Sequence, residues 1–345
     1  MSNEISFNAP LSFVHWDITS RCNLKCIHCR NELDTIGSNK ELDTQEGFNL
    51  IDHLADNFNL KWLSFDGGEP LLREDLTELI KKAKSRNLFV YLLTNGTLLT
   101  EDRVKKLKEV GLDSIQISLD GLENNHDWIR GKGSYKRALE GIRNAKKYDI
   151  RVTVRITVNN INIRDATELL KIVKELGCPA YGIRRVIPCG NAIKNIHLME
   201  PDKKEYIDTI QQTILIGGND IHIQIGADPV LIPKTHMLEE LKKEYGSDQV
   251  IAGCGAGITM CHISDGGDVF PCSTLPITAG NIRNKNLTEI WENSEVFLKL
   301  RKGRSILKGK CGNCNYKYIC GGCRASAYYY KKDMLGEDPY CLLEE

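Results

Sequence analysis

The chain has no excess of either charge, no long apolar run and no secretory signal. Its 345 residues include 46 Lys and Arg and 46 Asp and Glu, so the formal net charge is zero. A nucleic-acid-binding protein usually carries a basic excess. No apolar stretch approaches the roughly 20 residues that span a bilayer, and Met1–Pro10 lacks the basic and apolar regions of a signal peptide. We therefore expect a cytoplasmic protein that binds neither nucleic acid nor membrane.

Internal repeats and low-complexity segments are also absent, so the fold is predicted from the alternation of apolar patterns between residues 11 and 187. The predicted strands are Phe13–Ile18, Lys61–Phe65, Phe89–Leu93, Ser114–Leu119, Arg151–Val158 and Tyr181–Ile187. The predicted helices are Thr44–Asp56, Arg73–Arg86, Glu101–Val110, Ser134–Tyr148 and Asp165–Leu176. Strands that alternate with helices form right-handed crossovers and a parallel sheet. Six such units predict an α/β fold, a partial (β/α)6 barrel related to the TIM barrel.

The predicted strands carry polar residues on one face. Ser114, Gln116 and Ser118 alternate with apolar residues, and Arg155 and Thr157 do the same in a later strand, so the polar residues share one side of the sheet. A parallel sheet covered on both sides is apolar on both faces. A solvent-exposed face is one explanation. We prefer a polar barrel lumen that holds a ligand, because parallel sheets seldom leave a face bare.

The rest of the chain divides into a bridge and a cysteine-rich region. We predict a barrel domain over residues 11–189, a bridge over 190–253 and a small C-terminal domain over 254–345. In the bridge we expect a helix near Asp202–Ile214, a strand near Ile221–Ile225 and a helix near Met237–Tyr245. The C-terminal domain has one predicted helix near Thr288–Lys299 and little apolar sequence, so it would need metal to fold.

The most informative residues are the 13 cysteines. In a reducing compartment, clustered cysteines indicate metal ligation and not a disulfide framework. Cys22, Cys26 and Cys29 directly follow the first strand, where parallel α/β folds place active sites. Structural zinc and cubane iron–sulfur clusters usually take four protein ligands. Three cysteines would leave one iron of a [4Fe–4S] cluster free to bind a cofactor or substrate. The alternative is a structural metal completed by His28 or by a distant cysteine.

The spacing Cys-x3-Cys-x2-Cys resembles the signature of the radical S-adenosylmethionine (SAM) superfamily. Gly67, Gly68 and Glu69 end the second strand and resemble that family's Gly-Gly-Glu motif, which contacts the methionine amino group. The resemblance implies that Ser118 and Arg130 hold the carboxylate or ribose of SAM. It adds as candidate contacts Asn95, Asp120, Thr157 and Arg185. For Asn95, Thr157 and Arg185, an ordinary polar role in the lumen is an equal alternative.

The same resemblance implies a reaction. A reductant such as flavodoxin or ferredoxin would supply an electron to the [4Fe–4S] cluster, SAM would be cleaved, and a 5′-deoxyadenosyl radical would abstract a hydrogen atom from the substrate. In such enzymes the cofactor supplies the reactivity, and the protein supplies orientation and exclusion of water. We therefore expect a radical SAM oxidoreductase or maturase.

Eight further cysteines lie in the C-terminal region, enough for two fully ligated cubanes. A pair of zinc sites is the alternative. The set resembles the SPASM extension of radical SAM enzymes, which carries auxiliary [4Fe–4S] clusters. By that resemblance one cluster is ligated by Cys254, Cys261, Cys272 and Cys323, and the other by Cys311, Cys314, Cys320 and Cys341, giving three clusters in all. Only Gly321 and Gly322 separate Cys320 from Cys323, where many family members have three residues.

Two cysteines lie outside these groups. Cys178 precedes a proline between a helix and a strand and is expected to be a buried structural thiol. Cys189 follows the sixth strand, where it would face the active site. Packing is one role for Cys189. The other is donation of a hydrogen atom to a substrate radical, as in radical epimerases, and a Cys189→Ala variant that epimerises normally would exclude it.

The resemblance favours modification of a ribosomally made peptide or protein by crosslinking, oxidation or epimerisation. Its alternative is side-chain chemistry on a heme or heme-d1 type tetrapyrrole, which the sequences Cys-Ile-His-Cys-Arg and Gly-Gly-Cys-Arg-Ala and the final Asp-Pro-Tyr-Cys resemble. Arg155 and Arg185 would bind the carboxylates of either substrate. Only about ten residues precede the first strand, which weakens the peptide hypothesis because no leader-binding domain is fused there. A non-enzymatic iron–sulfur carrier or scaffold would not explain Gly67–Glu69.

Overall fold

A computed structural model describes residues 10–31, 40–225, 228–234 and 253–343. Seven neighbouring strands run parallel, as the sequence predicts for the first six. The strands of the barrel are β1 (Phe13–Thr19), β2 (Trp62–Gly67), β3 (Val90–Thr94), β4 (Ser114–Ser118), β5 (Arg151–Val158), β6 (Ala180–Arg185) and β7 (His222–Gln224). They form an open, curved sheet, so the α/β partial barrel is confirmed.

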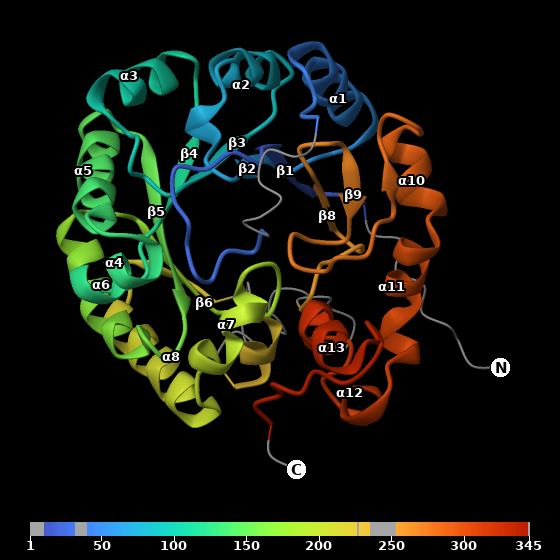
Figure 1. The fold of residues 1–345 in the computed structure, drawn as a ribbon. Helices are drawn as coiled ribbons and strands as arrows, with labels where there is room; N and C mark the ends of the chain where they lie inside the picture. The colour runs from blue at the N-terminus through green and yellow to red at the C-terminus, as the bar shows by residue number, and fades with distance from the viewer. Residues whose placement is uncertain (1–9, 32–39, 226–227, 235–252, 344–345) are drawn as a thin grey trace.

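Helices cover the outer face of this sheet (Figure 1). They are α1 (Thr44–Asn57), α2 (Leu76–Ser85), α3 (Glu101–Glu109), α5 (Ser134–Lys147), α6 (Ala166–Glu175) and α8 (Lys203–Gly217). Two further helices, α4 (Glu123–Arg130) and α7 (Ala192–Met199), lie at the carboxyl ends of the strands, where they contact the loop that carries Cys26. Side chains of the outer strand faces, such as Val14, Trp16 and Phe65, pack with the apolar faces of the helices in one hydrophobic core. Alternation of faces leaves polar side chains in the lumen.

Capping residues fix where two of the helices begin. Asp43 caps α1 in a capping box with Glu46, and Asp202 accepts bonds from two backbone N–H groups of α8. The predicted second helix begins later than expected, at Leu76. Residues Pro70–Leu72 instead form a 3-10 turn, and the Arg73 side chain turns inward to donate to the Ile18 carbonyl oxygen at 2.6 Å.

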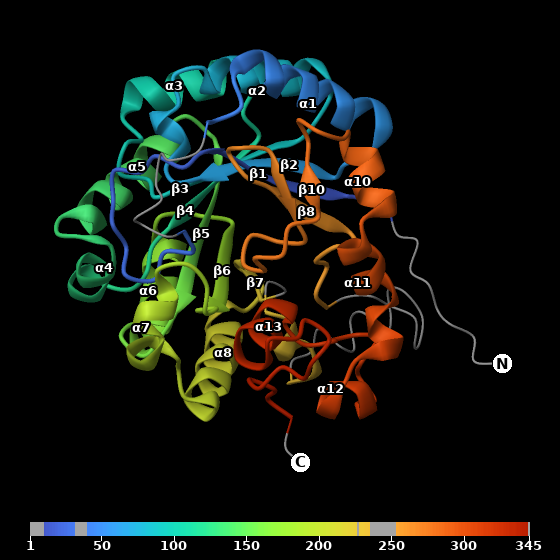
Figure 2. The ribbon, with the colours of Figure 1, turned by 45° about the vertical axis from the view of Figure 1, so that its right-hand side comes forward.

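The C-terminal region continues the barrel sheet. Strand β8 (Met260–Ile263) pairs in parallel with β1, and β9 (Asp268–Phe270) and β10 (Gly280–Asn281) follow antiparallel. Sequence analysis did not predict this pairing, nor the helices α4 and α7. Figure 2 shows β8 beside β1, and β9 and β10 extend the sheet beyond β8.

Short helices complete the C-terminal region and close the open side of the barrel (Figure 1). They are α10 (Leu287–Asn293), α11 (Glu295–Ile306), α12 (Gly309–Asn313) and α13 (Arg324–Lys331). The single helix predicted near Thr288–Lys299 is two helices, because Ser294 adopts an extended backbone between them. The helix predicted over Met237–Tyr245 lies outside the described residues.

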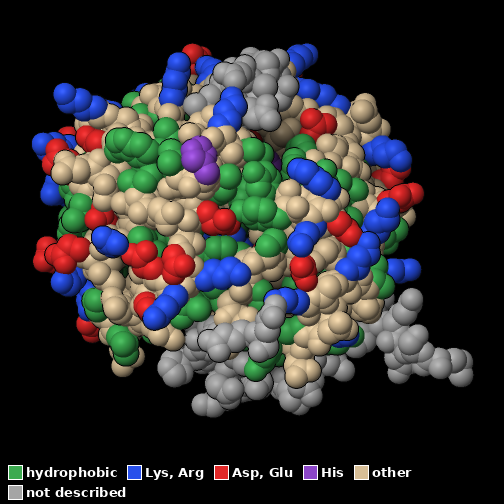
Figure 3. All heavy atoms as spheres, turned by 60° about the horizontal axis from the view of Figure 1, so that its bottom comes forward, with side chains coloured by type: hydrophobic (Ala, Val, Ile, Leu, Met, Phe, Trp, Pro, Cys, Tyr) green, Lys and Arg blue, Asp and Glu red, His purple; other side chains and the backbone are tan. Residues whose placement is uncertain are grey.

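Charged side chains of both signs are interspersed on the face shown in Figure 3. This mixture agrees with the equal totals of acidic and basic residues. In the part of the chain that the structure describes, no helix has the length and apolar character needed to cross a bilayer.

Candidate active site

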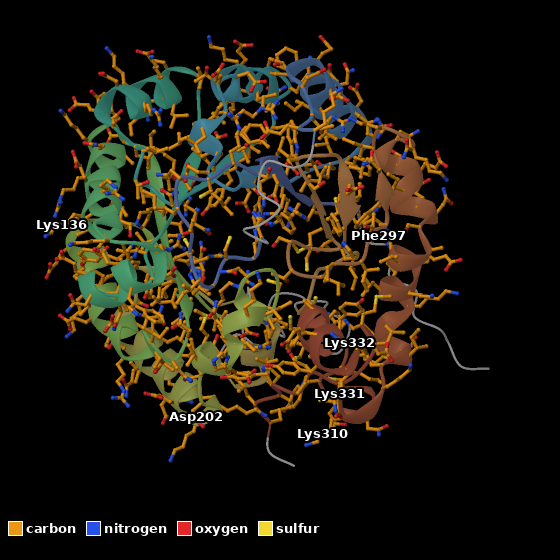
Figure 4. All side chains as sticks on the ribbon, viewed as in Figure 1. Lys136, Asp202, Phe297, Lys310, Lys331 and Lys332 are labelled. Carbon is orange, nitrogen blue, oxygen red and sulfur yellow. The ribbon has the colours of Figure 1, made fainter. Side chains whose placement is uncertain are left out.

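A cavity of about 920 Å³ occupies the lumen and is lined by cysteines from both predicted domains. Cys22, Cys26 and Cys29 reach it from the loop after β1. Cys254, Cys272 and Cys323 reach it from the C-terminal region, and Cys189 reaches it from the segment after β6. Figure 4 shows sulfur atoms in the middle of the molecule, between the barrel strands and the C-terminal helices. The cavity is therefore shared by the two predicted domains.

The cysteine loop is held by the end of β2. The Gly68 and Glu69 backbone N–H groups donate to the Thr19 and Arg21 carbonyl oxygens, each at 2.8 Å. A Cβ atom at Gly67 or Gly68 would lie 2.1 or 2.2 Å from these two carbonyl oxygens, and Gly67 has φ +131°. Only glycine allows this approach. Both glycines also line the cavity, so they support the cysteine loop and leave room for a ligand.

The Glu69 side chain holds neighbouring strand ends together beside the cavity. Its buried carboxylate accepts hydrogen bonds from the Thr94 hydroxyl (2.7 Å), the Asn95 N–H (2.8 Å) and the Leu71 N–H (3.1 Å). Burial raises the pKa of Glu69 to about 7, although these bonds oppose the rise. The side chain joins the ends of β2 and β3 and is not part of the cavity lining, whereas Gly67 and Gly68 do line the cavity.

Asp120 holds two basic side chains, Arg130 and His28, beside the cavity. It accepts from Arg130 Nε at 2.5 Å, from the Thr157 N–H at 2.7 Å, and lies 2.6 Å from His28 Nε2. Burial would raise the pKa of Asp120, but Arg130 and His28 outweigh it and hold the pKa well below its usual range. Asp120 is fully buried, whereas Ser118 and Arg130 line the cavity. Asp120 therefore acts through Arg130 and His28.

Comparison with known proteins decides the family. A family model described as "Radical SAM superfamily" matches residues 16–173, and one described as "Iron-sulfur cluster-binding domain" (SPASM) matches 254–315. The chain is 37% identical to the AdoMet-dependent heme synthase of Methanosarcina barkeri over 97% of both chains. The chain belongs to the radical SAM superfamily. It is an enzyme of the SPASM-containing group, and [4Fe–4S] clusters and SAM are its cofactors.

Other relatives in the radical SAM family have names that refer to different substrates or products. An Fe-coproporphyrin III synthase of M. barkeri is 31% identical over 96% of this chain and 87% of its own. A PqqA peptide cyclase of Bradyrhizobium diazoefficiens is 30% identical over 98% and 87%. Among solved structures, Streptococcus suis SuiB bound to S-adenosylmethionine superposes with a TM-score of 0.75 at 17% identity, over 97% of this chain and 78% of SuiB. SuiB therefore shares the fold.

The cysteine loop of this radical SAM enzyme suits an iron–sulfur cluster. Burial raises the pKa of Cys26 to about 12, although Arg130 opposes the rise, so a thiolate there needs a neighbouring cation such as iron. Among the described residues, no three His, Cys, Asp or Glu side chains converge on one metal ion. A [4Fe–4S] cluster does not require such convergence, because each thiolate binds a different iron. We propose that Cys22, Cys26 and Cys29 hold the cluster that binds SAM.

The predicted role of Cys261 is wrong. Cys261 pairs in register with Val14 of β1, and both side chains are fully buried in the hydrophobic core under the helices. Its neighbour His262 points the other way, with Nε2 3.1 Å from Asp17. Because successive side chains of a strand alternate faces, Cys261 cannot reach the cavity. Three of the four proposed ligands, Cys254, Cys272 and Cys323, do line it.

We expect Cys261→Ala to keep the iron content of the wild type and Cys272→Ala to lower it. The Cys261 thiol contacts core side chains, so its loss costs only about 1 kcal/mol of stability. The Cys272 thiol faces the cavity with Cys254 and Cys323. Iron per chain and visible absorption after anaerobic reconstitution measure the difference. Equal iron loss in both variants would contradict the assignment from strand register.

The predicted role of Arg185 is also wrong. In register, Arg184 pairs with Thr157 and Arg185 with Val158, so Arg184 and Thr157 face the lumen and Arg185 faces away. Arg185 is 1% exposed and lies 2.9 Å from Asp228 and 3.2 Å from Asp338. It joins the barrel to the bridge and to the C-terminal domain. The cavity arginines are therefore Arg30, Arg130, Arg155 and Arg184.

The second cysteine group lies away from the cavity, in the C-terminal domain. Its members are Cys311, Cys314, Cys320 and Cys341. Three of the sulfur atoms accept backbone N–H groups: Cys311 from Asp338 (3.4 Å), Cys314 from Tyr316 (3.3 Å) and Cys320 from Gly322 (3.3 Å). Such bonds favour thiolate over thiol. We propose that this group ligates an outer auxiliary cluster, close to the surface from which Lys310, Lys331 and Lys332 project (Figure 4).

The remaining predicted residues have simple locations. Asn95 and Thr157 line the cavity, and Asn95 also donates to the Asn23 side chain at 2.9 Å. Cys178 packs in the hydrophobic core, as expected of a structural thiol. Cys189 lines the cavity, and burial raises its pKa to about 12. Its role as a hydrogen-atom donor stays a prediction.

Sequence reasoning missed a buried ion network beside the cysteine loop. Arg30 donates to both Asp17 carboxylate oxygens, at 2.5 and 3.0 Å, and lies 3.4 Å from Asp66. Arg30 directly follows Cys29, so this bidentate pair fixes the end of the loop against β1 and β2. The alternation of His15 and Asp17 with core residues was the available signal, but it did not indicate that Arg30 is the partner of Asp17.

Proposed function

We propose that this radical SAM enzyme modifies propionate side chains of a tetrapyrrole. The observation that carries the proposal is the similarity to a heme synthase, which extends through barrel, bridge and SPASM domain alike. A relative named for Fe-coproporphyrin III supports the same substrate class. The peptide cyclase relative supports peptide modification, the hypothesis favoured by the sequence analysis, and this is the second candidate.

The residues of the cavity suit such a reaction. With its cofactors bound, the enzyme supplies a 5′-deoxyadenosyl radical that takes a hydrogen atom from the substrate. Loss of that hydrogen atom, of one electron to an acceptor, and of CO2 converts a propionate side chain into a vinyl group. The part of the protein is to bind the carboxylate, orient the side chain and exclude water. The lumen offers arginines and hydroxyl groups for this, among them Arg155, Arg184 and Ser118.

The test is an anaerobic assay of the reconstituted enzyme with SAM, a reductant such as flavodoxin or ferredoxin, and Fe-coproporphyrin III, which carries four propionates. We expect 5′-deoxyadenosine together with porphyrin that has lost CO2 and two hydrogens per modified propionic acid, both measured by mass spectrometry. Omission of SAM is the control. Formation of 5′-deoxyadenosine with unchanged porphyrin would reject the tetrapyrrole proposal, and a modified peptide encoded beside the gene would establish the second candidate.

A further inference from the structure

Two arginines of the lumen face the cavity without an acidic partner. Arg155 on β5 and Arg184 on β6 both line it and are half-buried. Within the described ranges, neither side chain makes a hydrogen bond or an ion pair, and Arg155 Nε is buried without a partner. The other two cavity arginines are neutralised by carboxylates, Arg30 by Asp17 and Arg130 by Asp120. An unpaired guanidinium in a cavity is costly unless a ligand compensates it.

Strand register brings these two guanidinium groups together. Arg155 pairs with Gly182, and Thr157 pairs with Arg184, so the arginines are diagonal neighbours on the lumen face of adjacent strands. Arg155 lies across Gly182, where an added Cβ would be 2.9 Å from Arg155 Nε. Gly182 is not among the glycines with positive φ. The absence of a side chain at Gly182 therefore leaves room for Arg155 and does not meet a requirement of the backbone.

The electrostatics of this pair suit an anion. Burial, with the charge of Arg184 as the next cause, lowers the pKa of Arg155 to about 10. Tyr91 and Asp66 are smaller causes that act in the opposite direction. Two like charges held side by side in a cavity repel each other, and a bound carboxylate would relieve this repulsion. Because guanidinium groups present forked donors, a carboxylate can accept from both.

We propose that Arg155 and Arg184 bind a carboxylate of the substrate and thereby set which side chain reacts. This inference rests on the proposed function, in which the carboxylate is a propionate of a tetrapyrrole. Arg155 also pairs in register with Ser118 of β4, the residue proposed to contact SAM. A carboxylate held here would therefore place its own side chain beside the SAM site, where the hydrogen atom is removed.

The first experiment measures affinity for Fe-coproporphyrin III by calorimetry, using enzyme loaded with its clusters and SAM. Arg155→Gln and Arg184→Gln are each expected to weaken binding about tenfold to a hundredfold, and Lys at either position should restore part of it. The matched control is Arg151→Gln, because Arg151 lies on β5 but is exposed at the other end of the strand. Iron content and SAM affinity should stay at wild-type values in every variant.

A second variant moves Arg155 without removing its charge. Gly182→Ala places a Cβ 2.9 Å from Arg155 Nε, which is too close unless the Arg155 side chain shifts, so we expect porphyrin binding to weaken severalfold while SAM binding is unchanged. Loss of SAM affinity with normal porphyrin affinity in the arginine variants would overturn the inference, because the arginines would then be cofactor contacts. Equal porphyrin affinity in wild type and variants would overturn it as well, and would leave the proposed function intact.

A labelling experiment separates the two proposals. Phenylglyoxal modifies accessible arginines, and mass spectrometry reports each site. We expect Fe-coproporphyrin III to protect Arg155 and Arg184, and its tetramethyl ester to protect neither. Protection by plain propionate at high concentration, without any effect of the porphyrin, would support the carboxylate site and reject the tetrapyrrole. No protection by either compound would reject the carboxylate site.

Discussion

Replacing Cys26 with Ala is expected to abolish 5′-deoxyadenosine formation and to remove one iron–sulfur cluster. Cys26 is 8% exposed at the wall of the cavity, and its carbonyl oxygen accepts the Asn191 side-chain amide at 3.2 Å. The loop is thus fixed by its backbone, so we expect the variant to lose one proposed cluster ligand and to keep its fold. With two thiolates left, the cluster that activates SAM should not persist, because a cubane normally takes at least three cysteines in this superfamily.

Three measurements check this prediction on anaerobically reconstituted protein: iron per chain, the electron paramagnetic resonance signal of the reduced clusters, and 5′-deoxyadenosine by chromatography. Iron should fall by about four per chain. Cys178→Ala is the matched control, because Cys178 is also buried but lies in the hydrophobic core. SAM cleavage at a comparable rate in the Cys26 variant would contradict the assignment of the activating cluster to this loop.

Replacing Arg185 with Met should destabilise the folded enzyme by about 3–5 kcal/mol, because it leaves two buried carboxylates without their cation. Asp228 and Asp338 are each 1% exposed at their side chains and are both held by Arg185. Asp338 also accepts the Cys323 N–H at 2.8 Å and the Ser326 hydroxyl at 2.7 Å. The loss would therefore loosen the C-terminal domain where it meets the barrel.

Thermal unfolding of the cluster-loaded protein measures this effect, and Arg184→Met is the control, since Arg184 makes no ion pair with any described residue. The pH dependence gives a second check. Burial raises the pKa of Asp228 even with Arg185 present. In the absence of Arg185, the Asp228 carboxylate should therefore be protonated more readily. The destabilisation should therefore be smaller near pH 5 than near pH 8. Equal stability of the two variants would show that the buried network contributes little.

Much of the site was predictable because its residues are close in sequence or follow strands. Cys22, Cys26 and Cys29 lie on one loop, and Gly67–Glu69 stands at the end of the next strand, so local spacing together with the family resemblance linked them. The structure added the reason for the glycines, which is the approach of the cysteine loop to the end of β2. The partners of Arg30 and Asp120 were not predictable, because they come from residues distant in sequence that meet only in the folded barrel.

The sequence by itself determined the parallel barrel, the polar lumen and the motifs of a radical SAM enzyme, because apolar periodicity and local cysteine spacing depend only on neighbours along the chain. The tertiary structure decided which of two adjacent residues faces the lumen. Cys261 and Arg185 lie in the outer layers, and His262 and Arg184 face inward. A strand alternates its faces whatever its partner, so only pairing with β1 and β5 shows which set of side chains enters the cavity.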